Sequence, residues 1–265
     1  MDENRGNVGE WTLNGTFAEL RMGQLTGRVD VAQPERGFHE IELAERRFAC
    51  QLLHVRRETE TGEIAEAGSC DKSSWPLKVG DAYVRGSDLV ASYSPADNWP
   101  YSPQIYWRAG TLNSIDDVVG SLSLLISVQT HLLDTWPRIS VSSHVACREA
   151  LLVKRNEAGA FSAEPLDRDC TMEPTDSACC LLFRPEGEPL SYAEIMAPND
   201  FCEVSIRPKK DGQCSVRWDL FADFLEKGVI RRSRVQCAFV QRKNDVELAA
   251  ACCEAFESRP LPLTT

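Results

Sequence analysis

Short runs of apolar, β-branched and aromatic residues recur along the chain and are separated by Gly, Pro, Asn and Asp. This pattern is typical of strands joined by turns. No helical pattern alternates with these runs, as a parallel sheet would require. The sequence therefore predicts a mainly β protein, a large antiparallel β-sandwich that occupies residues 1–265 as a single domain. The predicted strands are 25–31, 38–43, 48–56, 82–93, 104–108, 121–131, 138–154, 179–183, 201–207 and 230–241.

Two segments towards the C-terminus show helical periodicity instead. Residues 219–227 (DLFADFLEK) place apolar side chains at i, i+4 spacing and end before Gly228. Residues 244–258 begin at Asn244, a good N-cap residue with Glu three positions on, and carry a narrow apolar stripe. We expect two helices, of which the second is the C-terminal helix.

Residues 157–178 differ from the rest of the chain. They contain few large apolar side chains, two prolines and an excess of acids, so they bury too little to offset the entropy of ordering them. We expect a long acidic surface loop here, within the single domain.

The alternation is clearest in 121–131 (SLSLLISVQTH), where one face is apolar and the other is mostly polar. Residues 138–145 alternate in the same way, which predicts an antiparallel hairpin in which His131 lies opposite Arg138. In this register His131 and His144 would be about 20 Å apart along the ladder, too far to bind one metal ion. The hairpin therefore predicts a polar sheet face and no metal centre.

The charge balance narrows the range of partners. Forty acidic and 29 basic side chains give a net charge of −11, which disfavours nucleic acid. No run of 18 apolar residues predicts a membrane span, and the start Met1-Asp2-Glu3 does not resemble a signal peptide. We therefore expect a cytoplasmic protein. Its eleven cysteines contain no Cys-x-x-Cys pair, which favours small buried, reduced residues, with neither metal nor cofactor.

Aromatic residues concentrate in one part of the chain. Seven of the eleven Trp and Tyr residues fall within 75–107. Such rings can stack on sugars while polar neighbours bind the hydroxyl groups, or they can simply pin loops over the edge of a sandwich. If the polar face binds a carbohydrate-like ligand, the expected contacts are Tyr106, Arg108, Gln129, His131 and Arg138.

Three segments carry a resemblance to a known family. RGSDLVASY (85–93), a long strand with SVQTH (127–131) and FLEKGVIRRSRVQCAFV (224–240) resemble the supersandwich of the galactose-mutarotase-like family. The resemblance implies sugar binding on the concave face of a large sheet. It also implies, for an epimerase, a His acid and a Glu base beside an Arg and a second His. By position, Glu203 would be the base and His131 or His144 the acid.

Three functions remain open at this stage. The first is a carbohydrate-binding or mutarotase-like protein without a clear catalytic signature. The second is an aldose epimerase that uses Glu203 and a histidine. The third is a structural or protein-interaction sandwich with no small-molecule ligand. The chain contains neither the phosphate-binding G-x-x-x-x-G-K-[ST] motif nor the G-x-S-x-G motif of serine hydrolases.

Overall fold

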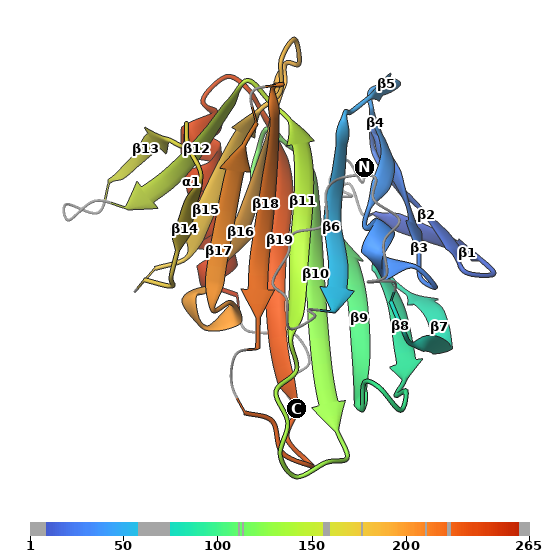
Figure 1. The fold of residues 1–265 in the computed structure, drawn as a ribbon. Coiled ribbons are helices and arrows are strands. Elements are labelled where there is room, and N and C mark those ends of the chain that lie inside the picture. The colour runs from blue at the N-terminus through green and yellow to red at the C-terminus, as the bar shows by residue number, and fades with distance from the viewer. Residues whose placement is uncertain are drawn as a thin grey trace.

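A computed structural model shows three antiparallel sheets and one C-terminal α-helix (Figure 1). It describes residues 9–57, 75–110, 112, 114–155, 160–175, 177–209, 211–221 and 224–259. The expected mainly β sandwich is therefore confirmed.

The largest sheet has nine strands. In spatial order they are β13 (Phe161–Pro165), β12 (Glu149–Arg155), β15 (Cys179–Arg184), β16 (Leu190–Met196), β19 (Arg231–Gln241), β10 (Val118–Thr130), β9 (Tyr101–Ala109), β8 (Asp88–Ser94) and β7 (Lys78–Arg85). In β10, Leu122, Leu124, Ile126 and Val128 are buried in the main core. The intervening residues face away from this core, as the alternation predicts.

Two five-stranded sheets complete the sandwich. One has the order β14 (Cys170–Met172), β17 (Glu203–Pro208), β18 (Gln213–Leu220), β11 (Ile139–Ala146) and β6 (Cys50–Arg57), and packs against the nine-stranded sheet. The other has the order β1 (Glu10–Asn14), β2 (Phe17–Met22), β3 (Leu25–Asp30), β4 (His39–Leu43) and β5 (Arg46–Arg47). A backbone bridge between Phe38 and Leu52 joins these two sheets beside β6. Short 3₁₀ turns, η1 (Pro34–Arg36) and η2 (Pro198–Asp200), lie between strands.

A polar cluster lies inside the sandwich. Glu194 on β16 is completely buried and accepts hydrogen bonds from the hydroxyl of Tyr192 (2.6 Å) and from Nε1 of Trp218 (2.8 Å). Trp218 belongs to β18, so this bond links the nine-stranded sheet to the five-stranded sheet packed on it. Burial raises the pKa of the Glu194 carboxyl.

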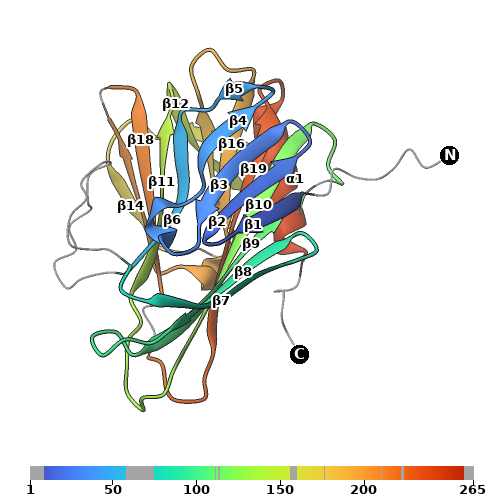
Figure 2. The ribbon, with the colours of Figure 1, turned by 90° about the vertical axis from the view of Figure 1, so that its right-hand side faces the viewer.

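The helix α1 (Asp245–Glu257) confirms the predicted C-terminal helix. It covers the other side of the nine-stranded sheet, so α1 and β11 lie on opposite sides of that sheet (Figure 2). Its residues Ala249, Cys253 and Phe256 are buried there, as the stripe predicts. Asn244 adopts a left-handed conformation and makes no side-chain cap, so the predicted capping arrangement is wrong. No helix among the described residues has the length and apolar character needed to cross a membrane.

The predicted hairpin is wrong. Strand β10 pairs with β9 and β19, whereas β11 pairs with β6 and β18, so the two strands belong to different sheets. Their apolar faces meet across the sandwich instead of side by side. His131 and Arg138 consequently lie in the connection between two sheets, not opposite each other on a ladder.

Several other boundaries also differ. The predicted helix 219–227 is wrong, because residues 219 and 220 continue β18 and no helix follows in the described part of this segment. The predicted strands 82–93 and 138–154 are each two strands. Two short strands, β13 and β14, lie within 157–178, where the sequence predicts only loop.

Exposed apolar side chains gather at one end of the molecule. We define the apolar tip as the described parts of segments 131–138 and 221–230, which lie at the bottom of Figure 1. The two segments are joined by the backbone bond from Leu225 N to Thr135 O (2.8 Å) and by edge-to-face contact of Trp136 with Phe224. The tip carries six of the nine exposed large hydrophobic side chains in the described chain: Leu132, Leu133, Trp136, Phe224, Val229 and Ile230.

Candidate functional site

Neighbouring strands of the sheet β14-β17-β18-β11-β6 place polar side chains on its outer face. We call this surface the histidine face. Direct pairing places Ser140 beside Asp219 and Asp219 beside Glu203, and in the next row Ser142 beside Arg217. A third row pairs His144 with Ser215. From β6, the same face receives His54 beside Ser142 and Arg56 beside Ser140.

Two imidazoles lie in contact on this face. The rings of His54 and His144 meet edge to face with their centroids 5.2 Å apart. Both side chains are largely buried, since His54 is 4% and His144 is 9% exposed. His144 Nδ1 shares a hydrogen bond with Ser215 Oγ at 2.9 Å.

The orientation of His54 is set by the turn η1. Its Nδ1 donates to the carbonyl oxygen of Glu35 at 2.7 Å, which leaves Nε2 as the acceptor nitrogen. Gly37 allows this close approach, because it has a φ of +65° and a Cβ there would overlap the carbonyl oxygen of Leu52. Nε2 of His54 is buried and has no hydrogen-bond partner in the described chain. This nitrogen is closed to solvent beneath the polar face.

Both imidazoles are neutral at pH 7. Burial lowers the pKa of His54 to about 4, with the neighbouring His144 and the charge of Arg56 acting in the same direction. Burial likewise lowers the pKa of His144 to about 4, with the charges of Arg56 and Lys209 acting in the same direction. Each neutral ring has one N–H donor and one acceptor nitrogen, and Nδ1 of both rings is already bonded within the protein.

An ion pair stands next to the histidines. Arg217 Nε donates to Asp219 Oδ1 at 2.8 Å, and both side chains are partly buried. Glu203 lies on the same face at the far end of the row through Asp219. His144 is four residues along β11 from the Ser140 that begins this row. Glu203 and His144 are thus separated by about 13 Å along the strands in addition to two strand spacings.

The expected ligand contacts divide between two places. Tyr106, Arg108 and Gln129 share the outer face of the nine-stranded sheet, because Gln129 pairs with Ser102 in the same register. There Arg108 forms a two-point ion pair with Asp88 (2.6 and 2.8 Å), and Tyr106 donates to Gln104 (2.8 Å). The polar groups of Tyr106 and Arg108 thus already bond to neighbouring side chains.

The remaining two expected contacts, His131 and Arg138, lie on the apolar tip. Both are exposed there. The structure therefore places three of the five expected contacts on one sheet face, where Gln129 lies four residues along β10 from the partner of Tyr106 and six from the partner of Arg108, and it leaves the other two at the end of the molecule. Separately, it places Glu203 and His144 on one face, at the separation given above.

The aromatic-rich segment has a packing role. Trp75 contacts Tyr93 and Trp99 at centroid distances of 5.2 and 5.3 Å, and Trp99 contacts Tyr101 at 5.2 Å. All four rings are buried. These rings pin loops against the sandwich and do not form a platform for a sugar.

Sequence reasoning missed His54, Arg217 and Asp219. The alternation of QCSVRWDL (213–220) was the available signal, because it places Ser215, Arg217 and Asp219 on one face of a strand. Assigning 219–227 to a helix concealed it. In the described chain, no group of three or more His, Cys, Asp or Glu side chains is arranged to hold a metal ion.

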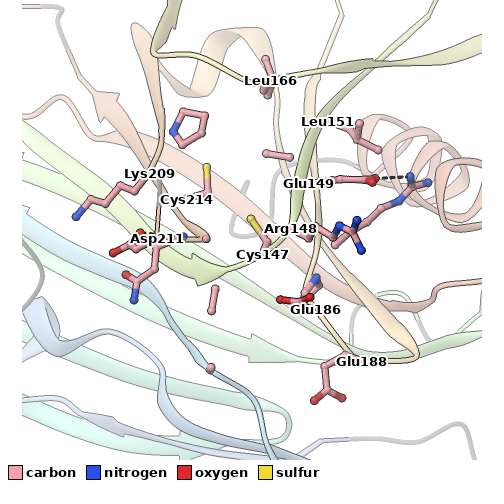
Figure 3. A pocket seen from close by; sticks show the side chains of 18 of the residues that line it. Cys147, Arg148, Glu149, Leu151, Leu166, Glu186, Glu188, Lys209, Asp211 and Cys214 are labelled. Carbon is pink, nitrogen blue, oxygen red and sulfur yellow. Dashed lines mark hydrogen bonds and ion pairs between the residues drawn. The ribbon is translucent and has the colours of Figure 1, made fainter.

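A separate pocket of about 940 Å³ lies at the end of the sandwich opposite the apolar tip (Figure 3). It is lined where β11 passes to β12, and by the turns between β15 and β16 and between β17 and β18. None of the residues expected from the sequence to bind or react lines it.

By sequence, the chain matches no protein-family model and none of the curated proteins. By structure, it is similar to a candidate aldose 1-epimerase from Klebsiella pneumoniae, with a TM-score of 0.53 at 9% identity, over 97% of this chain and 90% of that one. The fold is a mutarotase-type sandwich. A galactose mutarotase related enzyme from Lactobacillus acidophilus has a TM-score of 0.49 at 9% identity, over 88% of this chain and 97% of that one.

Proposed function

We propose that this mutarotase-type sandwich binds a carbohydrate on the histidine face. The observation that carries the proposal is the contact between His54 and His144, two neutral imidazoles held side by side among serine hydroxyls and an Arg–Asp pair.

The chemistry of this face suits a polyhydroxylated ligand. A sugar hydroxyl both donates and accepts, and neutral imidazoles and serine hydroxyls do the same. Arg217 adds charged donors whose direction is fixed by Asp219. The outer face of the nine-stranded sheet suits such a ligand less well, because the polar groups of Tyr106 and Arg108 are committed to Gln104 and Asp88.

Binding is favoured over epimerisation by the spacing of the titratable groups. An acid and a base that act on one sugar ring must both reach it within hydrogen-bond distance. Glu203 and His144 are separated by four residues along the strand and by two strand spacings, which exceeds the width of a monosaccharide. The two histidines, both neutral at pH 7, supply no protonated partner.

Saturation-transfer NMR against a panel of monosaccharides and sugar phosphates tests the proposal. We expect a ligand whose signal is lost in His144→Ala and in Arg217→Ala, because each variant removes hydrogen bonds that the ligand would share. Arg108→Ala and Arg138→Ala are the matched comparisons, since they alter the contacts expected from the sequence.

The pattern of losses decides between the two faces. Loss of the signal only in Arg108→Ala or Arg138→Ala would move the ligand away from the histidine face. No signal across the panel would count against carbohydrate binding. The epimerase would be established in place of a binding protein by two results together. The wild-type protein would accelerate the interconversion of the ligand's anomers, and the Glu203→Gln variant would not.

A second candidate function rests on the apolar tip. Leu133 is 76% and Trp136 54% exposed, and the tip is held by hydrogen bonds and a ring contact. Clustered exposed apolar side chains mark protein-interaction sites. This supports the protein-interaction sandwich as the alternative to sugar binding.

A further inference from the structure

The pocket at the end of the sandwich contains a pair of thiols. Cys214 pairs with Val145 across β18 and β11, and the backbone bond from Cys147 N to Gly212 O (2.8 Å) continues this register. Cys147 and Cys214 are therefore diagonal neighbours on adjacent strands. Both side chains line the pocket (Figure 3).

The two thiols act on each other. The Cys214 thiol donates a hydrogen bond to the Cys147 sulfur, which lowers the pKa of Cys147 and raises that of Cys214. Burial instead raises the pKa of Cys179, Cys252 and Cys253 to about 12. Cys147 is also the more exposed of the two, at 7% against 1% for Cys214, so it is the thiol that a molecule in the pocket reaches first. The thiolate is the reacting form of cysteine.

The rim of the pocket suits a small charged peptide. Arg148 and Lys209 contribute positive charge to the lining, and Asp211, Glu186 and Glu188 contribute negative charge (Figure 3). A volume of about 940 Å³ accommodates a molecule the size of a tripeptide. A peptide thiol with carboxylates and an ammonium group would find partners of both signs.

We propose that Cys147 is a site of reversible modification by a low-molecular-mass peptide disulfide of the glutathione class, with Cys214 as the positioning residue. The Cys147 thiolate attacks one sulfur of the disulfide, so a new S–S bond forms and the old one breaks. The departing peptide thiolate takes up the proton that Cys147 released. The protein retains a mixed disulfide, and attack by a free thiol on that bond restores Cys147.

The register explains why the mixed disulfide persists. Diagonal neighbours on antiparallel strands have Cα atoms about 7–8 Å apart, beyond the usual limit of about 6.8 Å for a disulfide. Cys214 therefore does not readily displace the peptide to bond Cys147 directly. The role of Cys214 is to donate the hydrogen bond that stabilises the Cys147 thiolate.

Incubation of the full chain with oxidised glutathione, followed by intact-mass and peptide mass spectrometry, tests this. We expect one glutathionyl adduct on Cys147 that dithiothreitol removes. In Cys214→Ala, modification at pH 7 slows several-fold and the midpoint of the pH–rate profile rises, because the thiolate loses its donor. Cys214→Ser restores a donor and should restore both quantities.

The wild-type map alone can overturn the proposal, so it does not depend on the folding of a variant. Cys170 and Cys202 are more exposed than Cys147, and an adduct on either instead of Cys147 would refute the site. A Cys147–Cys214 disulfide without an adduct, or a rate unchanged in Cys214→Ala, would refute the role of Cys214. Cys179→Ser, which alters a thiol outside the pocket, should keep the adduct. None of these results depends on sugar binding.

Discussion

The imidazoles of His54 and His144 are kept neutral by burial, and this state costs stability in acid. An unfolded histidine takes up a proton below about pH 6.5, whereas the folded rings do so only near pH 4. Between these values the unfolded chain binds more protons than the folded one. Each ring therefore contributes stability at neutral pH that is lost as the pH falls through this window.

His144→Gln should weaken this dependence. The amide keeps a hydrogen-bonding group near Ser215 but does not titrate. Between about pH 6.5 and pH 5 the wild type should lose about 1.5 kcal/mol more free energy of unfolding than the variant, because the slope for one histidine rises from about half of 1.4 kcal/mol per pH unit at pH 6.5 to most of it at pH 5. Urea unfolding at a series of pH values measures the difference.

Asp200 does not affect the comparison between the wild type and His144→Gln. Burial raises its pKa to about 6, so it acts in the opposite direction as the pH falls. It is present in both proteins, and its contribution cancels. Parallel pH profiles for wild type and variant would show that His144 takes up its proton equally in both states.

At the level of single residues, two of the candidates taken from the sequence lie on the histidine face. Glu203 and His144 were identified and do share a sheet face. His54 was not among the candidates, because nothing in the sequence indicates that β6 lies beside β11. Contacts between strands nearly 90 residues apart depend on sheet topology, which alternation does not encode.

Among the elements, alternation identified which face of a strand is buried but not which strand lies next to it. Leu124 and Val128 of β10 and Val141 of β11 are all buried in the core, as expected. Apolar side chains that meet across two sheets give the same pattern as side chains that meet along one ladder. The alternation therefore predicts a hairpin between β10 and β11, although the connection crosses from one sheet to the other.

The error at 219–227 has a similar cause. A short apolar run matches helix and strand templates about equally well. Pairing of residues 219 and 220 with β11 decides for the strand, and Phe221 then takes a positive φ of 60°. The long stripe of α1 carried more information and was predicted correctly.

The helix α1 should depend strongly on Phe256. This side chain is 1% exposed, and its ring lies 3.9 Å from the guanidinium carbon of Arg234. Phe256→Ala should lower the free energy of unfolding by about 3–5 kcal/mol, because it leaves a cavity and removes the cover over Arg234. Chemical denaturation measures the loss.

Phe17→Ala provides the matched control. Phe17 is 55% exposed, so the same truncation there should cost less than about 1 kcal/mol. Equal losses at the two positions would show that α1 contributes little to the stability of the sandwich.

For the whole molecule, the two ends of the sandwich differ in character. One end holds the charged thiol pocket and the other the apolar tip. A chain with a net charge of −11 resists association over most of its surface. Any association should therefore start at the tip.

The double variant Leu133→Ser, Trp136→Ser should remove that association. Both side chains are exposed, so the free energy of unfolding should change by about 0.5 kcal/mol or less per site. Sedimentation velocity at increasing concentration should show less self-association than for the wild type. Val84→Ser, at an exposed position on β7, should behave like the wild type. Unchanged association in the double variant would exclude the tip as the contact.

The buried bond between Glu194 and Trp218 bears on how this core can change. Together with the hydrogen bond from Ser143 of β11 to the same carboxyl, it joins the two sheets, so they cannot slide past each other without leaving a carboxyl group and an indole N–H unpaired in an apolar interior. Replacing one member alone is costly, whereas replacing Tyr192, Glu194 and Trp218 together by well-packed apolar residues can be nearly neutral. We therefore expect these three residues to be replaceable only together. Single substitutions, made one at a time, cannot convert this part of the core to an apolar one without a loss of stability.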